Sequence, residues 1–344
     1  MGKTPGKKRV LITGASGFIG SHVLRRFHGA EEWDAVGMIR PTSDLKRVLD
    51  ADYAFVRCSL PDLPRGTLTG FDTVVHVAGL SSDWGRYRDF RRANLEGSLA
   101  LFEEAVNAGV SRFIHFSSVV VYGFHGYRGL AEDCPSRPFE NPYCISKTET
   151  EARLLKGKDS LKLIILRPSN VYGPQDFSMT YPLFRALERG MSFFPDGGRH
   201  LTSPCYVGNL VEAVISAAAA EPPSGRAYNV TDGRDMTWAE FLALAAKVLG
   251  VKPPGRSLPS GALFAVGTIL EKLFACAGAA APPLITRYRI AQVMKDYSFS
   301  IERARRELGY SPVFSTRNGL ELSGAWYRST CPPHKKRPRR GTLR

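Results

Sequence analysis

The segment Val10-Leu11-Ile12-Thr13-Gly14-Ala15-Ser16-Gly17-Phe18-Ile19-Gly20 decides the fold of this chain. Its apolar start predicts a buried strand, and the glycines that follow predict a tight turn that opens a helix. Glycines let the backbone approach a ligand where a Cβ atom would collide, and the free N–H groups of a helix N-terminus suit a pyrophosphate. The stretch therefore indicates a dinucleotide site; the alternative is a glycine-rich turn that only packs helix against strand. The predicted binding residues here are Gly14, Ser16, Gly17, Phe18, Ile19 and Gly20.

Strand-like and helical segments alternate along the first half of the chain. Strand-like runs occupy residues 9–13, 35–39, 53–57, 73–77, 112–116 and 162–166, and the clearest helical patterns occupy 18–27, 90–108 and 143–155. This alternation predicts an α/β fold, namely a Rossmann-type doubly wound parallel sheet. Beyond Pro174 short helical patterns mix with Pro and Gly breaks, which indicates a smaller C-terminal α/β substrate lobe. The expected divisions are a dinucleotide-binding domain at 1–174, to which 205–231 returns, a substrate lobe at 175–331 and a disordered basic tail at 332–344.

The charge of the chain is concentrated at its ends. The net charge is +15 over 344 residues, which alone would suit a nucleic-acid partner. However, ten of the basic residues lie within the first nine and the last thirteen residues. We therefore expect a small-molecule substrate and no nucleic-acid partner.

Six cysteines occur without C-x-x-C spacing and without histidines at zinc-ligand spacing. They predict free thiols in a reducing compartment, hence a cytoplasmic protein without a metal. The longest apolar stretch, residues 258–285, contains Glu271, Lys272 and the pair Pro282-Pro283, so no integral membrane segment is expected, although an amphipathic lid or a surface-seeking segment would fit.

Tyr143 and Lys147 are four residues apart in a helical pattern and so share one face of the helix. A nearby ammonium favours phenolate, so we expect the pKa of Tyr143 to fall toward neutrality and Tyr143 to serve as a general acid or base. An amphipathic helix that merely carries both residues is the alternative.

Ser118 follows the predicted strand at 112–116, within Ser117-Ser118-Val119-Val120-Val121-Tyr122-Gly123. A hydroxyl at the carboxyl end of a parallel strand faces the ligand crevice, where it can donate to a substrate oxygen. The alternative is a serine that only satisfies the backbone at the strand end.

Together these segments resemble the extended short-chain dehydrogenase/reductase family, which includes nucleotide-sugar epimerases, dehydratases and 3β-hydroxysteroid dehydrogenases. The resemblance covers about residues 9–328, through six ordered motifs: 13–20, 76–79, 94–98, 117–123, 143–147 and 167–174. It implies a hydride exchanged between a substrate carbinol carbon and a nicotinamide. It also implies Ser118, Tyr143 and Lys147 as catalytic residues, Tyr143 being the acid/base, and further cofactor contacts from Tyr143, Lys147, Val77, Ala78, Gly79, Asn94 and Pro168.

Four positions depart from the family pattern. Dehydratases of the family follow the catalytic hydroxyl with an Asp-Glu pair, and Val119 and Val120 stand there, which disfavours dehydration. Arg40 ends the second strand where NAD-specific members carry an acid. The expected cofactor is NAD or NADP, and Arg40 favours NADP because a guanidinium can bind the 2′-phosphate of that cofactor. Ser59 stands where an acid near adenine is common.

The substrate class is open between two branches of the family. Asn170 resembles the epimerase residue that contacts a diphosphate, whereas 282–310 resembles 3β-hydroxysteroid dehydrogenases and 2-alkyl-3-oxoalkanoate reductases. The expected substrate-binding residues are Trp84, Ser118, Asn170 and Tyr206.

These features predict an NAD(P)-dependent oxidoreductase that interconverts a secondary alcohol and a ketone. The alternatives are a nucleotide-sugar 4-epimerase with tightly bound NAD and a non-catalytic dinucleotide sensor. A homodimer through the helices at 90–108 and 143–155 is a further expectation.

Overall fold

A computed structural model describes residues 6–191 and 193–330 of the chain. The predicted tail at 332–344 lies outside the described residues. The central element is a seven-stranded sheet in which every pair of neighbours is parallel, with the order β12-β7-β5-β4-β1-β2-β3. Its strands are β1 (Lys8–Thr13), β2 (Trp33–Ile39), β3 (Ala54–Arg57), β4 (Thr73–His76), β5 (Arg112–Phe116), β7 (Lys162–Pro168) and β12 (Arg226–Val230).

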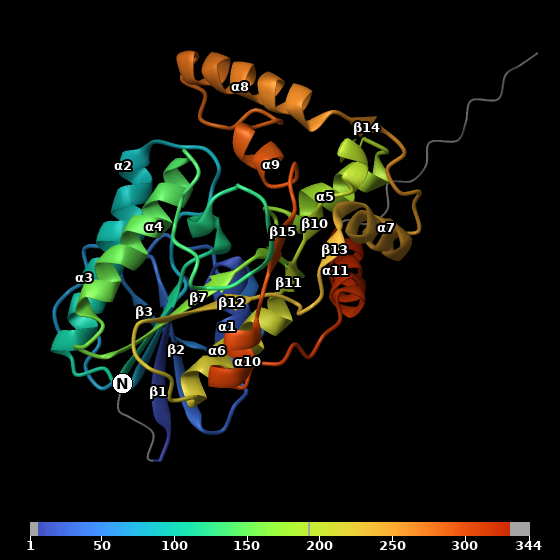
Figure 1. The fold of residues 1–344 in the computed structure, drawn as a ribbon. Helices are drawn as coiled ribbons and strands as arrows, with labels where there is room; N and C mark the ends of the chain where they lie inside the picture. Colours follow the sequence, from blue (N-terminus) through green and yellow to red (C-terminus); the bar gives the residue numbers. More distant parts are fainter. Residues whose placement is uncertain (1–5, 192, 331–344) are drawn as a thin grey trace, which may run out of the picture.

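Helices cover both faces of this sheet (Figure 1), as the alternating pattern requires. One face carries α1 (Phe18–His28), α6 (Val207–Ala219) and α10 (Glu302–Leu308); the other carries α2 (Tyr87–Phe90), α3 (Gly97–Asn107) and α4 (Pro142–Leu154). Side chains alternate between the two cores: Val10 and Ile12 pack toward α1 and α6, and Leu11 packs toward α3. The doubly wound α/β prediction is thereby confirmed.

The predicted helix at 90–108 is not a uniform α-helix. Residues Arg91–Glu96 form a π-helical segment, η2, between α2 and α3. Such wider turns recur at functional positions in helices. The edge strand β12 was not among the strand-like runs of the sequence.

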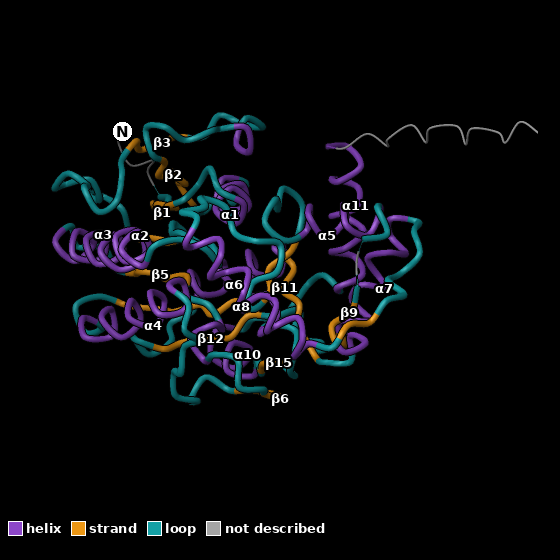
Figure 2. The backbone as a smooth tube through the Cα atoms, turned by 90° about the horizontal axis from the view of Figure 1, so that it is seen from above, coloured by secondary structure: helices purple, strands orange, loops and turns teal. Residues whose placement is uncertain are grey.

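The second lobe stands beside the sheet and packs around its own core (Figure 2). It is built from α5 (Thr180–Glu188), α7 (Trp238–Leu249) and α11 (Thr316–Thr330). Four short strand pairs lie outside the large sheet. They are β8 (Asn170–Tyr172) with β11 (Pro204–Tyr206), β6 (Tyr127–Leu130) with β15 (Tyr297–Phe299), β10 (Leu201–Thr202) with β13 (Met236–Thr237), and β9 (Phe194–Pro195) with β14 (Ser257–Leu258).

A helical hairpin, residues 260–291, extends across the top of the molecule in Figure 1. It consists of α8 (Ser260–Cys276), a loop and α9 (Arg287–Ala291). Within the described residues, none of the helices combines the length and the apolar character that crossing a bilayer needs. The remaining elements are single turns: η1 (Lys46–Val48), η3 (Val119–Tyr122), η4 (Leu155–Gly157) and η5 (Asp196–Gly198).

Candidate active site

The glycine turn after β1 is shaped by close backbone contacts. Gly14 has φ +65°, which side-chain-bearing residues rarely adopt. A Cβ atom on Gly20 would lie 2.1 Å from the carbonyl oxygen of Gly14, so α1 can approach the turn only with glycine there. Gly17 begins α1 without a side-chain cap, and the first turn carries no acidic residue. The first-turn amides are thus left for an anion, and the turn fits the pyrophosphate of a dinucleotide.

A chain of hydrogen bonds links this turn to the neighbouring strands. The amide of Ala78 donates to Thr13 Oγ1 at 3.0 Å, and Thr13 Oγ1 lies 2.8 Å from His76 Nδ1. His76 Nε2 lies 2.8 Å from Ser98 Oγ, which itself donates to the carbonyl oxygen of Asn94 at 2.5 Å. We call this chain the His76 relay.

The relay assigns one tautomer to His76. The single proton of the Ser98 hydroxyl goes to Asn94, so Ser98 accepts from a protonated Nε2 of His76. Nδ1 is then the acceptor of the Thr13 hydroxyl proton. Burial, assisted by the charge of Lys147, lowers the pKa of His76 to about 3. The ring is therefore neutral, and each hydrogen bond of the relay keeps the same donor and acceptor.

Asn94 joins the relay to the catalytic helix. The π-helical segment places its side chain against the loop after β4, where it accepts from the Leu80 amide at 2.7 Å and donates to the Leu80 carbonyl oxygen at 3.0 Å. Its Nδ2 also donates to Ser146 Oγ at 2.9 Å, and Ser146 donates to the carbonyl oxygen of Tyr143 at 2.8 Å. Asn94 therefore fixes the loop that carries Gly79 and the first turn of α4 in one arrangement.

Helix α4 is held at both ends. Asn141 caps its start by accepting from the Tyr143 amide at 2.9 Å. One turn beyond Lys147, Glu151 forms a buried two-point ion pair with Arg167 of β7, at 3.0 Å to Nε and 2.5 Å to Nη2. The helix is thus fixed to the strand that ends in Pro168.

Ser118, Tyr143 and Lys147 meet where β5 ends. Ser118 Oγ accepts from the Val120 amide at 3.3 Å and lies 3.5 Å from the Pro168 carbonyl oxygen. The hydroxyl of Ser118 also lies near enough to the Tyr143 phenol to oppose the rise that burial causes in its pKa. Lys147 Nζ donates to the Phe116 carbonyl oxygen at 2.7 Å, and a Cβ atom on Gly79 would lie 3.6 Å from Nζ. The ends of β4, β5 and β7 therefore bring the predicted catalytic residues to one edge of the sheet.

The direction of the Tyr143 pKa shift contradicts the expectation from spacing. Burial raises the pKa of Tyr143, and hydrogen bonds from Ser81 and Ser118 offset only part of that rise. The expected fall was wrong because the ammonium of Lys147 points to the Phe116 carbonyl, while burial disfavours the phenolate. Burial likewise lowers the pKa of Lys147 to about 8, which Glu151 partly opposes.

The other predicted residues are spread over the same edge and beyond it. Arg40 is exposed directly after β2. Trp84 Nε1 donates to the Ala279 carbonyl oxygen at 3.0 Å, and Asn170 Nδ2 donates to Thr202 Oγ1 at 3.3 Å. Tyr206 is buried in the core of the second lobe, with its ring against Tyr172 and Phe314, in a cluster separate from that of Tyr143.

Two residues at this site were not predicted from the sequence. The hydroxyl of Ser81 opposes the rise that burial causes in the pKa of Tyr143, and Tyr288 of α9 packs against the cluster around Tyr143. Ser81 follows the motif at 76–79 closely enough to have been a candidate. Tyr288 lies within the 282–310 segment, whose resemblance indicates a substrate class but no contact with Tyr143.

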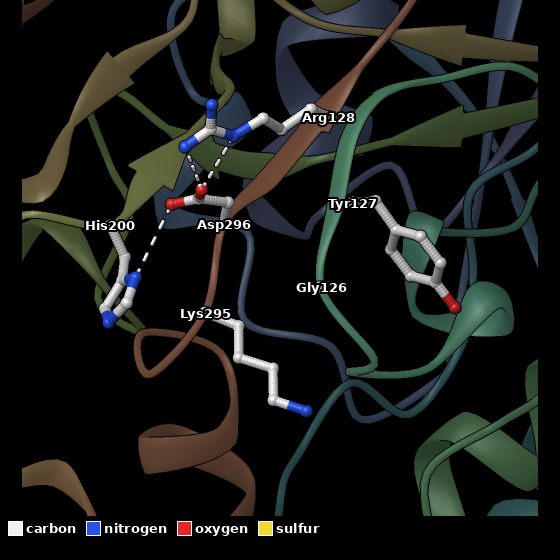
Figure 3. Close-up of a pocket in the computed structure, with 6 residues that line it drawn as sticks. All are labelled: Gly126, Tyr127, Arg128, His200, Lys295 and Asp296. Atoms are coloured by element: carbon white, nitrogen blue, oxygen red, sulfur yellow. Dashed lines mark hydrogen bonds and ion pairs between the residues drawn. The ribbon is translucent and has the colours of Figure 1, made fainter.

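An open depression of about 380 Å³ lies between the loop before β6 and β15, lined by Gly126, Tyr127, Arg128, His200, Lys295 and Asp296 (Figure 3). Its centre is an ion-pair cluster. Arg128 lies 2.7 Å from Asp296, and the His200 ring lies 3.4 Å from Asp296 and 3.5 Å from Asp196. The cluster binds the loop to the strand and does not include the predicted catalytic residues.

Comparisons with known proteins agree with this geometry. The profile of the "NAD dependent epimerase/dehydratase family" matches residues 10–231. "Uncharacterized protein YbjS" of Escherichia coli (strain K12) is 31% identical, covering 96% of this chain and 100% of that protein. A "4-hydroxy-2-methyl-3-oxo-4-farnesyl-3,4-dihydroquinoline-1-oxide ketoreductase" of Stigmatella aurantiaca is 27% identical, covering 91% of this chain and 95% of the relative. A "3 beta-hydroxysteroid dehydrogenase/Delta 5-->4-isomerase" of Mycobacterium tuberculosis (strain CDC 1551 / Oshkosh) is 29% identical, covering 91% and 88%.

Among solved structures, "MoeE5 in complex with UDP-glucuronic acid and NAD" superposes with a TM-score of 0.74 at 26% identity. The match covers 94% of this chain and 100% of that one. The similarity therefore extends over both lobes.

Proposed function

The chain belongs to the NAD dependent epimerase/dehydratase family, and we propose that it interconverts a secondary alcohol and a ketone on a predominantly apolar substrate. The observation that carries the proposal is the convergence of Ser118, Tyr143 and Lys147 beside the glycine turn. A non-catalytic dinucleotide sensor would not need this set.

The state of each group suggests its role. Because burial raises its pKa, Tyr143 is a neutral phenol near pH 7 and can give its proton to a ketone oxygen. Ser118 is placed to hydrogen-bond the same oxygen, and the hydroxyls of Ser118 and Ser81 can stabilise the phenolate that remains. The bound cofactor supplies or accepts the hydride at the carbinol carbon. In the reverse direction the phenolate form of Tyr143 takes the proton of the alcohol.

The surroundings of Tyr143 favour an apolar substrate. Phe90, Val120 and Cys144 pack with Tyr143, and Phe124, Phe139 and Tyr288 border that cluster. The ketoreductase and the 3 beta-hydroxysteroid dehydrogenase among the relatives support the same substrate class. Asn170 and the similarity to MoeE5 support the second candidate, a nucleotide-sugar 4-epimerase.

NADP is proposed as the preferred cofactor because of Arg40. Its side chain is exposed after β2 and forms no ion pair with any described residue. Ser43 lies beside it, accepting from the Arg40 amide at 3.0 Å. Arg40→Ala should raise the Kd for NADP⁺ about tenfold or more and leave that for NAD⁺ unchanged. The exposed Arg65→Ala is the control, and equal effects on both cofactors would contradict the proposal.

Transfer of a label separates the two candidate functions. Ketones of steroid-like, β-keto acid and aliphatic type are incubated with NADPH deuterated at the transferable position, and alcohols are analysed by mass spectrometry. We expect deuterium on the carbinol carbon with matching consumption of NADPH. Epimerisation of a UDP-sugar without net cofactor consumption would instead establish the epimerase. The cytoplasmic location and the homodimer remain predictions.

A further inference from the structure

The outer face of α8 is apolar and exposed, the reverse of an ordinary surface helix. Val266, Ile269 and Leu273 are 44%, 59% and 59% exposed and repeat at the spacing of a single helix face. Ala262, Ala265 and Cys276 extend this face, which we call the outer face of α8. Lys272 is the one charged residue among the exposed residues of α8, all of which the structure describes.

The opposite side of the hairpin is packed. A Cβ atom on Gly267 would lie 3.1 Å from the carbonyl carbon of Thr286, so the loop before α9 runs close against the middle of α8. Glu271, the single acidic residue of the hairpin, is bound by Arg287 at 2.8 Å. The outer face is thus the part of α8 that its own chain leaves uncovered.

The hairpin is also bonded to the active site. Asp83 accepts from Thr286 Oγ1 at 2.8 Å and pairs with Arg289 at 2.8 Å, and its carbonyl oxygen accepts from Asn141, the cap of α4. On α9, Tyr288 borders the cluster around Tyr143. The hairpin therefore carries the outer face on α8 and, on α9, a residue that packs beside Tyr143.

Charge indicates what covers the outer face. Among the basic residues at 260–291, Arg287 pairs with Glu271 and Arg289 pairs with Asp83, so Lys272 supplies the positive charge beside the outer face. The whole chain carries +15. A second copy packed on this face would bring like charges together, which opposes association. An anionic surface would instead be attracted by Lys272 and by the net charge of the protein.

We propose that the outer face of α8 docks the protein on the surface of an anionic lipid bilayer. With 17 residues α8 spans roughly 25 Å, and it would lie in the interface with Val266, Ile269 and Leu273 among the acyl chains. Leu284 on the following loop, 85% exposed, would add to the inserted surface. Docking in this way brings the active site next to a store of apolar ligands, but it does not depend on the reaction proposed above.

Flotation of the full chain with vesicles tests the docking. Vesicles of phosphatidylcholine alone are compared with vesicles that also contain phosphatidylglycerol, at low and high salt. We expect the wild type to float with the anionic vesicles and less so at high salt. The double variant Ile269→Glu/Leu273→Glu should lose about tenfold or more in partitioning, since two carboxylates would have to enter the interface. Leu322→Glu, on an exposed position of α11 outside the hairpin, is the matched control and should float like the wild type.

Each other outcome overturns the proposal. A wild type that does not float, or a double variant that floats equally well, contradicts docking through this face. Sedimentation velocity without lipid tests whether a second copy covers the face. If the wild type is a dimer, the double variant is a monomer and neither floats, the face serves self-association instead. Turnover of a water-soluble ketone should be equal for wild type and double variant. If the protein is inactive on every ketone, the proposed function is contradicted, but the flotation result still tests the docking.

Discussion

The sheet edge around His76 and the α8–α9 hairpin make opposite use of polar and apolar groups. At the sheet edge buried hydroxyls, an amide side chain and an imidazole bond to one another in a continuous chain. On the hairpin aliphatic side chains face outward, and ion pairs fasten the inner side. The edge fixes the geometry of the reacting groups, whereas the hairpin provides a wall and an outer surface. Substitutions at the edge should therefore change stability and cofactor binding. On the hairpin, substitutions on the inner side should change substrate binding and substitutions on the outer face of α8 should change lipid binding.

A closer contrast lies within the sheet itself. His76 and His115 are register partners on β4 and β5, with ring centroids 5.5 Å apart, and both are 1% exposed. Both nitrogens of His76 are hydrogen-bonded, while neither nitrogen of His115 has a partner among the described residues. The pair separates the effect of the relay from the effect of burying a ring.

The largest effect is expected from replacing the two rings in turn. His76→Phe removes one hydrogen-bond partner from each of the buried Thr13 and Ser98 hydroxyls, so it should lower the free energy of unfolding by about 2–4 kcal/mol. It should also weaken cofactor binding, because Thr13 holds the Ala78 amide. Urea unfolding at pH 7 and fluorescence titration with NADPH measure both.

His115→Phe is the matched control, since the same substitution there removes no hydrogen bond seen in the structure. It should leave the stability unchanged or slightly increased. Equal losses from both substitutions would show that the relay contributes nothing beyond packing.

Acid should destabilise the protein through these buried rings. Burial lowers the pKa of His115 well below its ordinary value, and lowers those of His76 and His22 to about 3 and about 4. Below about pH 6.5 the unfolded chain therefore binds protons that the folded chain does not. Above that pH the neutral rings do not lower the stability. Below it, each ring lowers the free energy of unfolding by about 1.4 kcal/mol per pH unit.

Urea unfolding between pH 7 and pH 4.5 measures this slope. His115→Phe should reduce this slope by one proton. A slope that is identical in wild type and His115→Phe would exclude a buried neutral His115.

The smallest effect is expected at the contact between the two regions. Tyr288→Leu shortens the wall beside Tyr143 and should raise KM several-fold, an effect of about 1 kcal/mol. The NADPH dissociation constant and the stability should change little, in contrast to His76→Phe. If Tyr288→Leu lowered the affinity for NADPH and left the KM for the ketone unchanged, the hairpin would contribute to cofactor binding and not to substrate binding, which contradicts this account.

Much of the fold and of the catalytic edge follows from the sequence. Thr13–Gly20 predicts the turn, and Ser118 and Tyr143 come together because parallel strands end at one edge. The direction of the Tyr143 pKa shift could not be predicted, since spacing to Lys147 reveals neither burial nor the competing Phe116 carbonyl.

Features that depend on contacts between distant parts of the chain could not be predicted from the sequence either. Tyr288 lies on α9, and its contact with the cluster around Tyr143 is formed only by the tertiary structure. The outer face of α8 shares its apolar composition with a core helix, and only the tertiary structure distinguishes an exposed stripe from a buried one. The π-helical turn that positions Asn94 resembles any helical segment in its pattern of apolar residues.

The most direct test of the central claim is the turnover of Tyr143→Phe with NADPH and a ketone substrate of the wild type. We predict a fall in kcat of about 10²- to 10⁴-fold with an unchanged Kd for NADPH, because only the proton donor is removed. The control is Tyr87→Phe, which removes an exposed phenol bonded to Glu149 of the same α4 helix. Wild-type turnover by Tyr143→Phe would contradict the assignment of Tyr143 as the acid/base of this site.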